Sequence, residues 1–396
     1  MALQRRLSLP LLVFYGLGGI IGAGIYVLLG EVAAIASSGM GLSFLLAGGI
    51  AGLTGMSYAE LSSRYPQSAG SVLFVDVAFH KPWLSRLMAA SLLSVSAISS
   101  AVICRGFVGY FQLYVDLSDS LIIVLLCLTM FMIASWGIKQ SAMFVTLITI
   151  LEIGGLVIVA VVASELPQRT AYLDVVNVSV GLGPIFAAAF IAFYAFIGFE
   201  DMVNVAEEVI EPKVTMPRGV LIAVVVSSLL YFTVAAVAIL RIDLDALSHS
   251  ASPISMMVGH RPGVMNLISM ISMVAIINGA IVQVIMSARV LYGMADRGLA
   301  PLVFARLHPR TQTPVLSTFL ASAVVMVLAL SFDLVDLANV TSALMLAVFA
   351  LVNVSLIKIK MTEVPSADHF NVPILIPWCA LVTTLVLLLL QLSTMI

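Results

Sequence analysis

The stretch GLGGIIGAGIY, residues 16–26, decides which fold this sequence predicts. It lies inside an apolar run, residues 10–37, that is long enough to cross a bilayer as a helix. Five of the nine positions from 16 to 24 are glycine, and each glycine costs a helix interior about 1 kcal/mol relative to alanine. The stretch therefore predicts either an unwound point in a membrane-spanning helix or a face of small residues packed closely against another helix.

A second apolar run, residues 183–209, carries a similar interruption. Gly198 comes just before Glu200 and Asp201, which lie well inside this run. Carboxylates at that depth in a bilayer normally face a cavity, a partner or an ion path, because burying them in lipid is costly. The run therefore predicts a second broken helix, with both acids as candidate functional groups.

The composition places the whole chain in a membrane. Of its 396 residues, 62% are hydrophobic and 10% are charged, and the mean hydropathy is +1.17. Soluble domains have about 45–50% apolar and about 25% charged residues. Apolar runs between charged and turn-forming residues predict an all-α protein of about eleven membrane-spanning helices, at residues 10–37, 41–63, 83–111, 119–136, 141–164, 183–209, 216–240, 263–294, 314–332, 335–358 and 373–395. Residues 69–79 are too short to cross and are predicted to be interfacial or re-entrant, and residues 243–261 to form an external loop.

The positions of the basic residues predict the orientation. With the N-terminus inside, fourteen of the 18 lysine and arginine residues fall at cytoplasmic helix ends or loops. This bias is the usual one for membrane proteins, and the opposite orientation would remove it. We therefore expect a multi-pass protein of the cell membrane (a plasma or inner membrane) with a cytoplasmic N-terminus and an external C-terminus.

The two interrupted helices are the first and the sixth, so they begin two units of five helices each. An odd number of crossings gives such units opposite orientations in the membrane. We therefore expect one transporter domain over residues 1–396, with one inverted repeat at 1–164, a second at 183–358 and an extra helix at 373–395. Paired interruptions in inverted halves are typical of the binding site of a secondary transporter. Free amides at a half-helix start would bind a carboxylate, and free carbonyls an ammonium.

The chain resembles the amino acid–polyamine–organocation superfamily of permeases over essentially its whole length. The motifs that carry this resemblance are GGIIGAGIY at 18–26, SYAELSSRYPQSAG at 57–70, GIKQSA at 137–142, FYAFIGFEDMVNVAEEVIEP at 193–212 and SARVLYGMADRGLAP at 287–301. The fourth motif is most similar to the branch of cationic-amino-acid-transporter-like permeases. The resemblance implies a five-plus-five inverted repeat with broken helices 1 and 6.

The resemblance also implies which residues contact the substrate. The backbone amides of Gly22, Ala23 and Gly24 would hold the substrate carboxylate. The carbonyls of Ile20, Tyr194 and Ile197 would hold the amino group. The side chains of Tyr194 and Phe199 would form walls of the pocket.

Coupling to an ion is expected at Glu152. In proton-coupled members of the superfamily, a lysine of the fifth helix stands beside the unwound first helix, and Glu152 is the matching position here. A carboxylate at this point can take up a proton or ligate Na⁺, so H⁺ and Na⁺ are both candidate coupling ions. The alternative is a structural ion pair between Glu152 and Arg105, the only basic residue inside a predicted span. Glu200 and Asp201 are the other candidate proton carriers.

The function that these patterns favour is secondary active transport of amino acids, coupled to an ion (with protons favoured) or running by exchange, as symport or antiport. A carrier of polyamines or other organic amines is the alternative, and an ion channel is a weaker one, since no filter-like sequence appears. An enzyme is not expected, because all five histidines fall in loops and no nucleophile, Walker or metal-ligand motif is present. We expect no cofactor, no metal site and no nucleic-acid partner; the sequence assigns no oligomeric state.

Overall fold

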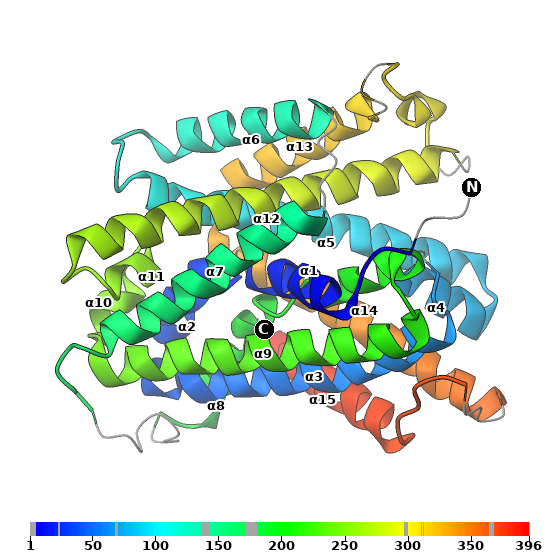
Figure 1. The fold of residues 1–396 in the computed structure, drawn as a ribbon, viewed down its shortest axis with the longest axis horizontal. Coiled ribbons are helices and arrows are strands. Elements are labelled where there is room, and N and C mark those ends of the chain that lie inside the picture. The colour runs from blue at the N-terminus through cyan, green and yellow to red at the C-terminus, as the bar shows by residue number, and fades with distance from the viewer. Residues whose placement is uncertain are drawn as a thin grey trace.

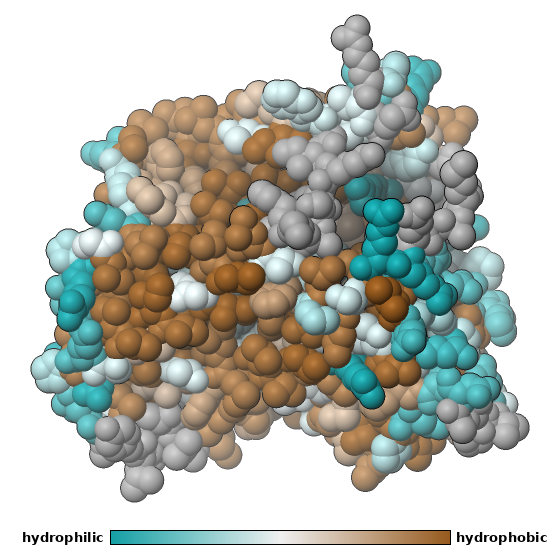
Figure 2. All heavy atoms as spheres, viewed as in Figure 1, coloured by the Kyte–Doolittle hydropathy of each residue, from teal (hydrophilic) through white to brown (hydrophobic). Residues whose placement is uncertain are grey.

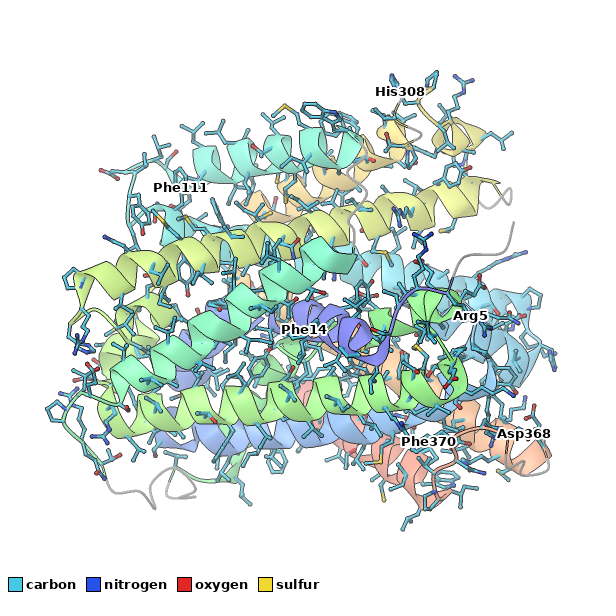
Figure 3. The ribbon with its side chains drawn as sticks, in the orientation of Figure 1. Arg5, Phe14, Phe111, His308, Asp368 and Phe370 are labelled. Atoms are coloured by element: carbon cyan, nitrogen blue, oxygen red, sulfur yellow. The ribbon has the colours of Figure 1, made fainter. Side chains whose placement is uncertain are left out.

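The computed structural model of the protein describes residues 5–22, 24–67, 70–136, 142–170, 180–296, 300–309, 311, 313–363 and 368–395. Within these residues all regular structure is helical, apart from one isolated bridge between Leu7 and Val209. The long helices run roughly parallel and antiparallel to one another in a single bundle (Figure 1). The N-terminal end of this bundle carries Arg5, Asp368 and Phe370, and the opposite end carries Phe111 (Figure 3).

The predicted spans are found with ends displaced by four residues at most. The corresponding helices are α1 (Leu9–Ile21) with α2 (Gly24–Ala36), α3 (Met40–Arg64), α5 (Pro82–Phe111), α6 (Asp119–Trp136), α7 (Ala142–Ala163), α8 (Leu182–Tyr194) with the 3₁₀ helix η3 (Phe199–Glu208), α9 (Pro212–Arg241), α12 (Pro262–Asp296), α13 (Val315–Ser331), α14 (Leu334–Thr362) and α15 (Leu375–Met395). The agreement is close because long apolar runs bounded by charges and prolines determine where helices cross a bilayer.

This chain is a multi-pass membrane protein. Nine helical stretches of the described residues are long and apolar enough to cross a bilayer, the first of which, Gly24–Arg64, includes both α2 and α3. Three further apolar helices of the described residues are shorter, namely α1, α13 and Gly70–Phe79. On the face drawn in Figure 2, hydrophobic residues cover the middle of the bundle and hydrophilic residues gather towards its two ends. Such an apolar belt is what the hydrocarbon core of a membrane requires.

The short helices lie at the two ends of the bundle. Helix α4 (Gly70–Phe79), predicted to be interfacial or re-entrant, packs against α5 and α14 near the N-terminal end and buries Phe74 and Val75 (Figure 1). Helices α10 (Leu244–Ser248) and α11 (Pro253–Met256) lie at the other end, inside the segment predicted to be a loop (Figure 1). The remaining short elements are the 3₁₀ turns η1 (Ser37–Gly39) and η4 (Leu302–Ala305).

Two packed pairs of helices enclose the broken ones. Helix α3 packs along α9, and α5 packs along α12. The half-helix α1 lies against α7 and α9, whereas α8 lies against α3 and α14. The segment before α1 is fixed to the end of η3, because the amides of Arg6 and Leu7 donate to the Glu208 carbonyl at 2.7 and 2.9 Å. The interruptions of both broken helices are thereby held in the interior of the bundle.

Candidate functional site: the crossing of two broken helices

The first predicted interruption is real. Helix α1 ends at Ile21 and a separate helix α2 begins at Gly24; Ala23 itself lies outside the described residues. The alternative of close packing also holds for the same glycines. A Cβ on Gly18 would overlap the hydroxyl oxygen of Thr149 on α7, and a Cβ on Gly16 would overlap the sulfur of Met202 on η3. The glycine-rich stretch therefore has two roles. Gly16 and Gly18 let α1 pack closely against its neighbours, and the helix is interrupted between Ile21 and Gly24.

The second predicted interruption is also present. Helix α8 ends at Tyr194, and η3 begins at Phe199 after a turn. Gly198 has φ +130°, a conformation that residues with a side chain rarely adopt. The carboxylate of Glu200 accepts a hydrogen bond of 2.8 Å from the Gly198 amide, so it satisfies one of the amides left free at the start of η3. The sequence did not indicate that this second half-helix would be a 3₁₀ helix.

The two interruptions meet in the interior of the bundle. A Cβ on Gly198 would overlap the carbonyl group of Gly19, and a Cβ on Gly24 would overlap the backbone of Ala195. The backbones of the two broken helices are therefore in direct contact at two points. Ile20 and Gly24 are buried at this crossing, as is Gly22. These described residues are the ones that the resemblance assigns to the substrate carboxylate and amino group.

A tyrosine of α9 ties the two interruptions together. The hydroxyl of Tyr231 lies 2.8 Å from the Ile20 carbonyl oxygen and 3.0 Å from the Ala195 carbonyl oxygen. Both carbonyls belong to backbone freed from regular helix pairing, and the single hydroxyl proton is shared between them. Sequence analysis did not single out Tyr231. A tyrosine in the middle of an apolar span was the only signal that could have indicated it.

The predicted residues on the α8 side occupy different environments. Tyr194 is buried, and its hydroxyl bonds the hydroxyl and the carbonyl of Ser99 at 2.9 and 3.0 Å. Its own carbonyl accepts from the Ile197 amide at 3.1 Å. Phe199 is fully buried, with its ring centroid 5.5 Å from that of Tyr58 and 5.1 Å from that of Phe349. In this conformation the Phe199 ring packs against these two rings, at the end of the turn that joins α8 to η3, and it does not line a cavity.

A cavity of about 410 Å³, here called the central cavity, begins beside the crossing at Ile197. It is lined from η3, α4, α5, α12 and α14, and it contains both predicted acids, Glu200 and Asp201. Arg289 and Gln283 of α12 face it as well, although sequence analysis did not select them. Gln283 is an uncharged polar side chain within a long apolar run, a signal that would have justified its selection.

Glu152 lies behind the first interruption on α7. Its side chain is 1% exposed, and neither carboxylate oxygen has a hydrogen-bond partner among the described residues. Its backbone carbonyl accepts from the Tyr26 hydroxyl at 2.8 Å, so the start of α2 is fixed to α7. One turn earlier, the Thr149 hydroxyl lies 3.1 Å from the Phe14 carbonyl oxygen, which fixes α7 to α1.

The alternative ion pair between Glu152 and Arg105 is wrong. The Arg105 guanidinium donates from Nε to the Phe332 carbonyl at 3.0 Å and lies 3.9 Å from an Asp333 oxygen. Arg105 is close to the end of α5, beside the start of α14, whereas Glu152 is in the middle of α7. The two residues are therefore at different depths in the bundle.

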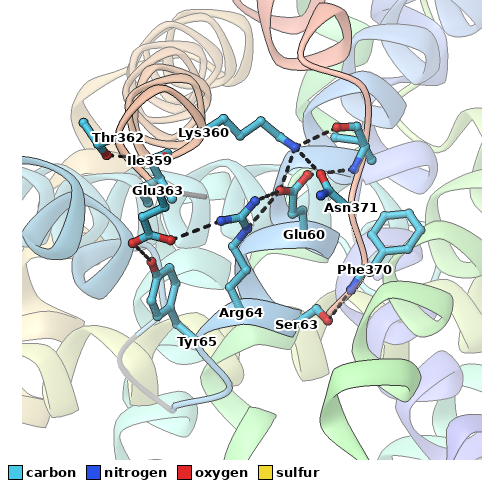
Figure 4. A network of polar contacts seen from close by, with 11 residues as sticks. Glu60, Ser63, Arg64, Tyr65, Ile359, Lys360, Thr362, Glu363, Phe370 and Asn371 are labelled. Carbon is cyan, nitrogen blue, oxygen red and sulfur yellow. Dashed lines mark hydrogen bonds and ion pairs between the residues drawn. The ribbon is translucent and has the colours of Figure 1, made fainter. Parts of the chain in front are cut away.

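A second cluster of charges lies at the N-terminal end (Figure 4). Glu60 and Arg64 form an ion pair at 2.6 Å, and Lys360 of α14 contacts the same Glu60 oxygen at 2.8 Å. The other Glu60 oxygen accepts from the Val372 amide at 2.8 Å. Arg64 also reaches Glu363 at 3.2 Å. This cluster fastens α3 to α14 and to the segment before α15.

The comparisons with known proteins agree with this architecture. The family model described as amino acid permease matches residues 7–395. Cationic amino acid transporter 2, vacuolar, of Arabidopsis thaliana is 30% identical over 382 residues, which cover 90% of this chain and 60% of the relative. Branched-chain amino acid permease BcaP of Bacillus subtilis is 28% identical over 402 residues, covering 94% and 84%. The methylthioribose transporter of the same bacterium is 27% identical over 399 residues, covering 94% and 85%.

The chain spans less than two thirds of the length of the plant transporters that it matches, at 60% and 63% for two of them. The match to the family model nevertheless extends from just before α1 into α15. It includes both interruptions and the helices that surround them. The chain belongs to the amino acid permease family of the amino acid–polyamine–organocation superfamily.

Proposed function

We propose that the protein is a secondary transporter that moves amino acids across the cell membrane. The observation that carries this proposal is the buried crossing of two interrupted helices beside a cavity of about 410 Å³. Amides at the start of α2 attract a carboxylate, and carbonyls near the ends of α1 and α8 accept bonds from an ammonium. An amino acid carries both groups a few ångströms apart. Relatives named for cationic and branched-chain amino acids support this substrate class.

The contacts of Tyr231 support a specific mode of binding. Its hydroxyl donates a hydrogen bond that is shared between the carbonyl oxygens of Ile20 and Ala195. A substrate ammonium is a stronger donor to these carbonyls than a neutral hydroxyl, since charge-assisted hydrogen bonds are about twice as strong as neutral ones. Binding thus exchanges the tyrosine contact for the ammonium contact, and the carboxylate is held by the amide of Gly24, since the Gly22 amide already donates to the Gly18 carbonyl at 3.3 Å. The substrate side chain then extends towards the central cavity.

We propose protons as the coupling ion and Glu152 as their carrier. This carboxylate is buried behind the first interruption with no hydrogen-bond partner among the described residues, and it carries charge only when deprotonated. A buried charge without a partner is costly, so an arrangement of α1 and α2 that buries Glu152 favours its protonation. By the same linkage, protonation of Glu152 favours that arrangement of α1 and α2. Glu200 is less suited to this role, because its carboxylate is held by the Gly198 amide.

The inverted repeat and the orientation complete the proposal. Helices α3 and α9 pack together, as do α5 and α12, and α6 and α13. These are the second, third and fourth spans of each predicted unit paired with their counterparts, as two interlocked repeats require. The distribution of basic residues supports a cytoplasmic N-terminal end and an external C-terminus. The central cavity then faces the cytoplasm, since α4, which lies near the N-terminal end of the bundle, contributes to its lining.

An organic amine without a carboxylate is the second candidate substrate. Glu200 and Asp201 give the central cavity two carboxylates, against the single guanidinium of Arg289. Purified protein in liposomes separates the candidates by uptake of labelled amino acids and polyamines under imposed proton and sodium gradients, applied one at a time. We expect saturable amino acid uptake driven by the proton gradient. Uptake of polyamines alone, or no saturable counterflow, would overturn the amino acid proposal.

A further inference from the structure

A separate polar cavity of about 340 Å³ lies at the end of the bundle that carries α10 and α11; we call it the outer cavity. Its volume is within the range of about 300–1,000 Å³ usual for small-molecule sites. Four helices and the segment before α11 contribute to it. The lining residues that the argument uses are Val27, Glu31, Arg105, Gln112, Asp119 and Asp333. Nothing in the proposed transport site uses these side chains.

The helices around the outer cavity pack tightly at two glycines of α5. A Cβ on Gly106 of α5 would overlap the side chain of Val27 on α2. A Cβ on Gly109 would overlap the carbonyl group of Ala251, in the segment before α11. The outer cavity and the central cavity have no described lining residue in common. The outer cavity is therefore a compartment distinct from the central cavity in this conformation.

The charges of the outer cavity are opposite and incompletely paired. Arg105 is its only basic residue, with a guanidinium that is 22% exposed. Its ion pair with Asp333 is long, at 3.9 Å, and the Asp333 side chain is 87% exposed. Asp119 accepts from the Gln112 amide at 2.8 Å. Glu31 forms no ion pair with any other described residue, although it lines the same cavity.

We propose that the outer cavity is a second binding site for a free amino acid, whose carboxylate binds Arg105 and whose ammonium binds Glu31. The choice of ligand rests on the proposed function. A guanidinium holds a carboxylate through two parallel hydrogen bonds, and it keeps donors available after its bond to the Phe332 carbonyl. The long contact with the exposed Asp333 is screened by solvent, so a substrate carboxylate replaces it at little cost.

The position of the outer cavity suits it to deliver substrate to the helix crossing. It lies on the side from which the helix crossing is closed, which the distribution of basic residues predicts to be external. An amino acid held there is next to Val27 of α2, the half-helix that begins at the crossing. The outer site thus raises the local concentration of substrate before the crossing becomes accessible.

The test is a binding titration of the purified protein in detergent with the labelled amino acid that gives the highest uptake in liposomes. We expect two bound molecules per chain, and one for Arg105→Gln or for Glu31→Gln. In uptake assays Arg105→Gln raises KM by about tenfold or more while kcat changes little, as loss of a charged hydrogen bond predicts. Arg169→Gln is the matched control, because it removes another ion pair, with Asp243 at 3.2 Å, outside the outer cavity.

Asp333→Asn distinguishes a binding site from a simple gate between α5 and α14. If Arg105 binds substrate, freeing it from Asp333 gives equal or tighter binding at the outer site. If the ion pair is only a gate, Asp333→Asn and Arg105→Gln have the same effect, and that result overturns the proposal. A stoichiometry of one that neither Arg105→Gln nor Glu31→Gln alters also overturns it, but leaves amino acid transport intact. Failure of every amino acid to bind the wild-type protein overturns both proposals.

Discussion

Gly198 lies directly against the carbonyl group of Gly19, so the two broken helices meet backbone to backbone with no side chain between them. The same approach recurs at Gly24, which faces the backbone of Ala195. Such contact leaves the amides and carbonyls of both interruptions close enough to act on one small ligand. It also makes the crossing sensitive to a single methyl group at either glycine.

Gly198→Ala is therefore expected to abolish substrate binding. An alanine at φ +130° is strained by about 1–3 kcal/mol, and its Cβ would overlap the Gly19 carbonyl, forcing the two interruptions apart. Gly154→Ala on α7 is the control, because a Cβ there meets no atom within 4 Å. Equilibrium binding and liposome uptake measure both variants. Wild-type affinity in Gly198→Ala would place the substrate somewhere other than this crossing.

Glu152→Gln is expected to uncouple transport from the proton gradient. The amide imitates the protonated carboxylate, so binding and counterflow persist, whereas uptake no longer responds to an imposed pH difference. The unfolding temperature should not fall, since the change removes a buried charge whose oxygens have no described hydrogen-bond partner. Glu165→Gln serves as the control, because its partner is Arg261 on the surface, at 2.6 Å. Retained coupling in Glu152→Gln would transfer the proton-carrying role to Asp201 or Glu200.

The sequence predicted the helices and both interruptions, because these depend on local composition. Apolar length determines each span, and glycine marks the points where a span unwinds or packs closely. Gly198 followed by Glu200 was enough to indicate the second break. The spacing could not show that Phe199 faces Tyr58 and Phe349, since a turn followed by a 3₁₀ helix has no 3.6-residue periodicity to extrapolate.

Contacts between distant segments were the part that the sequence could not supply. A pair of Arg105 with Glu152 was the alternative to a coupling role for Glu152, because both residues are charged and both lie in predicted spans. Depth along each helix, however, decides which charges meet. The actual partner, Asp333, lies in the short connection between α13 and α14. The path of this connection depends on where each of the two helices packs in the bundle. The link between Glu60 and Lys360 likewise joins residues 300 positions apart.

Glu60→Gln is expected to destabilise the protein strongly. Glu60 is fully buried and contacts Arg64 and Lys360, whose side chains are 5% and 9% exposed. Removing the carboxylate takes from two buried cations the one buried anion that they share, which costs about 3–5 kcal/mol. Glu363→Gln removes a partner of Arg64 that is 46% exposed, so its effect should be about 0–1 kcal/mol. Thermal unfolding in detergent compares the two variants. Equal losses of stability would show that the burial of Glu60 does not determine how much it contributes to stability.

Tyr231→Phe tests whether the substrate ammonium takes the carbonyls of Ile20 and Ala195. Without the hydroxyl, both buried carbonyls lose their donor in the empty protein, which destabilises it by about 1–3 kcal/mol. A bound ammonium satisfies the same carbonyls, so the loss is smaller in the complex. Substrate therefore binds more tightly and raises the unfolding temperature further than in the wild type.

Tyr110→Phe is the matched control for this prediction. Its hydroxyl bonds the Tyr26 carbonyl at 2.6 Å, so the variant also removes a buried bond to the backbone of a broken helix, away from the interruption. It should lower the unfolding temperature of the empty protein while leaving the shift produced by substrate unchanged. A substrate-induced shift that is the same in Tyr231→Phe as in the wild type would mean that the ammonium binds other acceptors. The proposed exchange between tyrosine and ammonium would then fail, whether or not the protein carries amino acids.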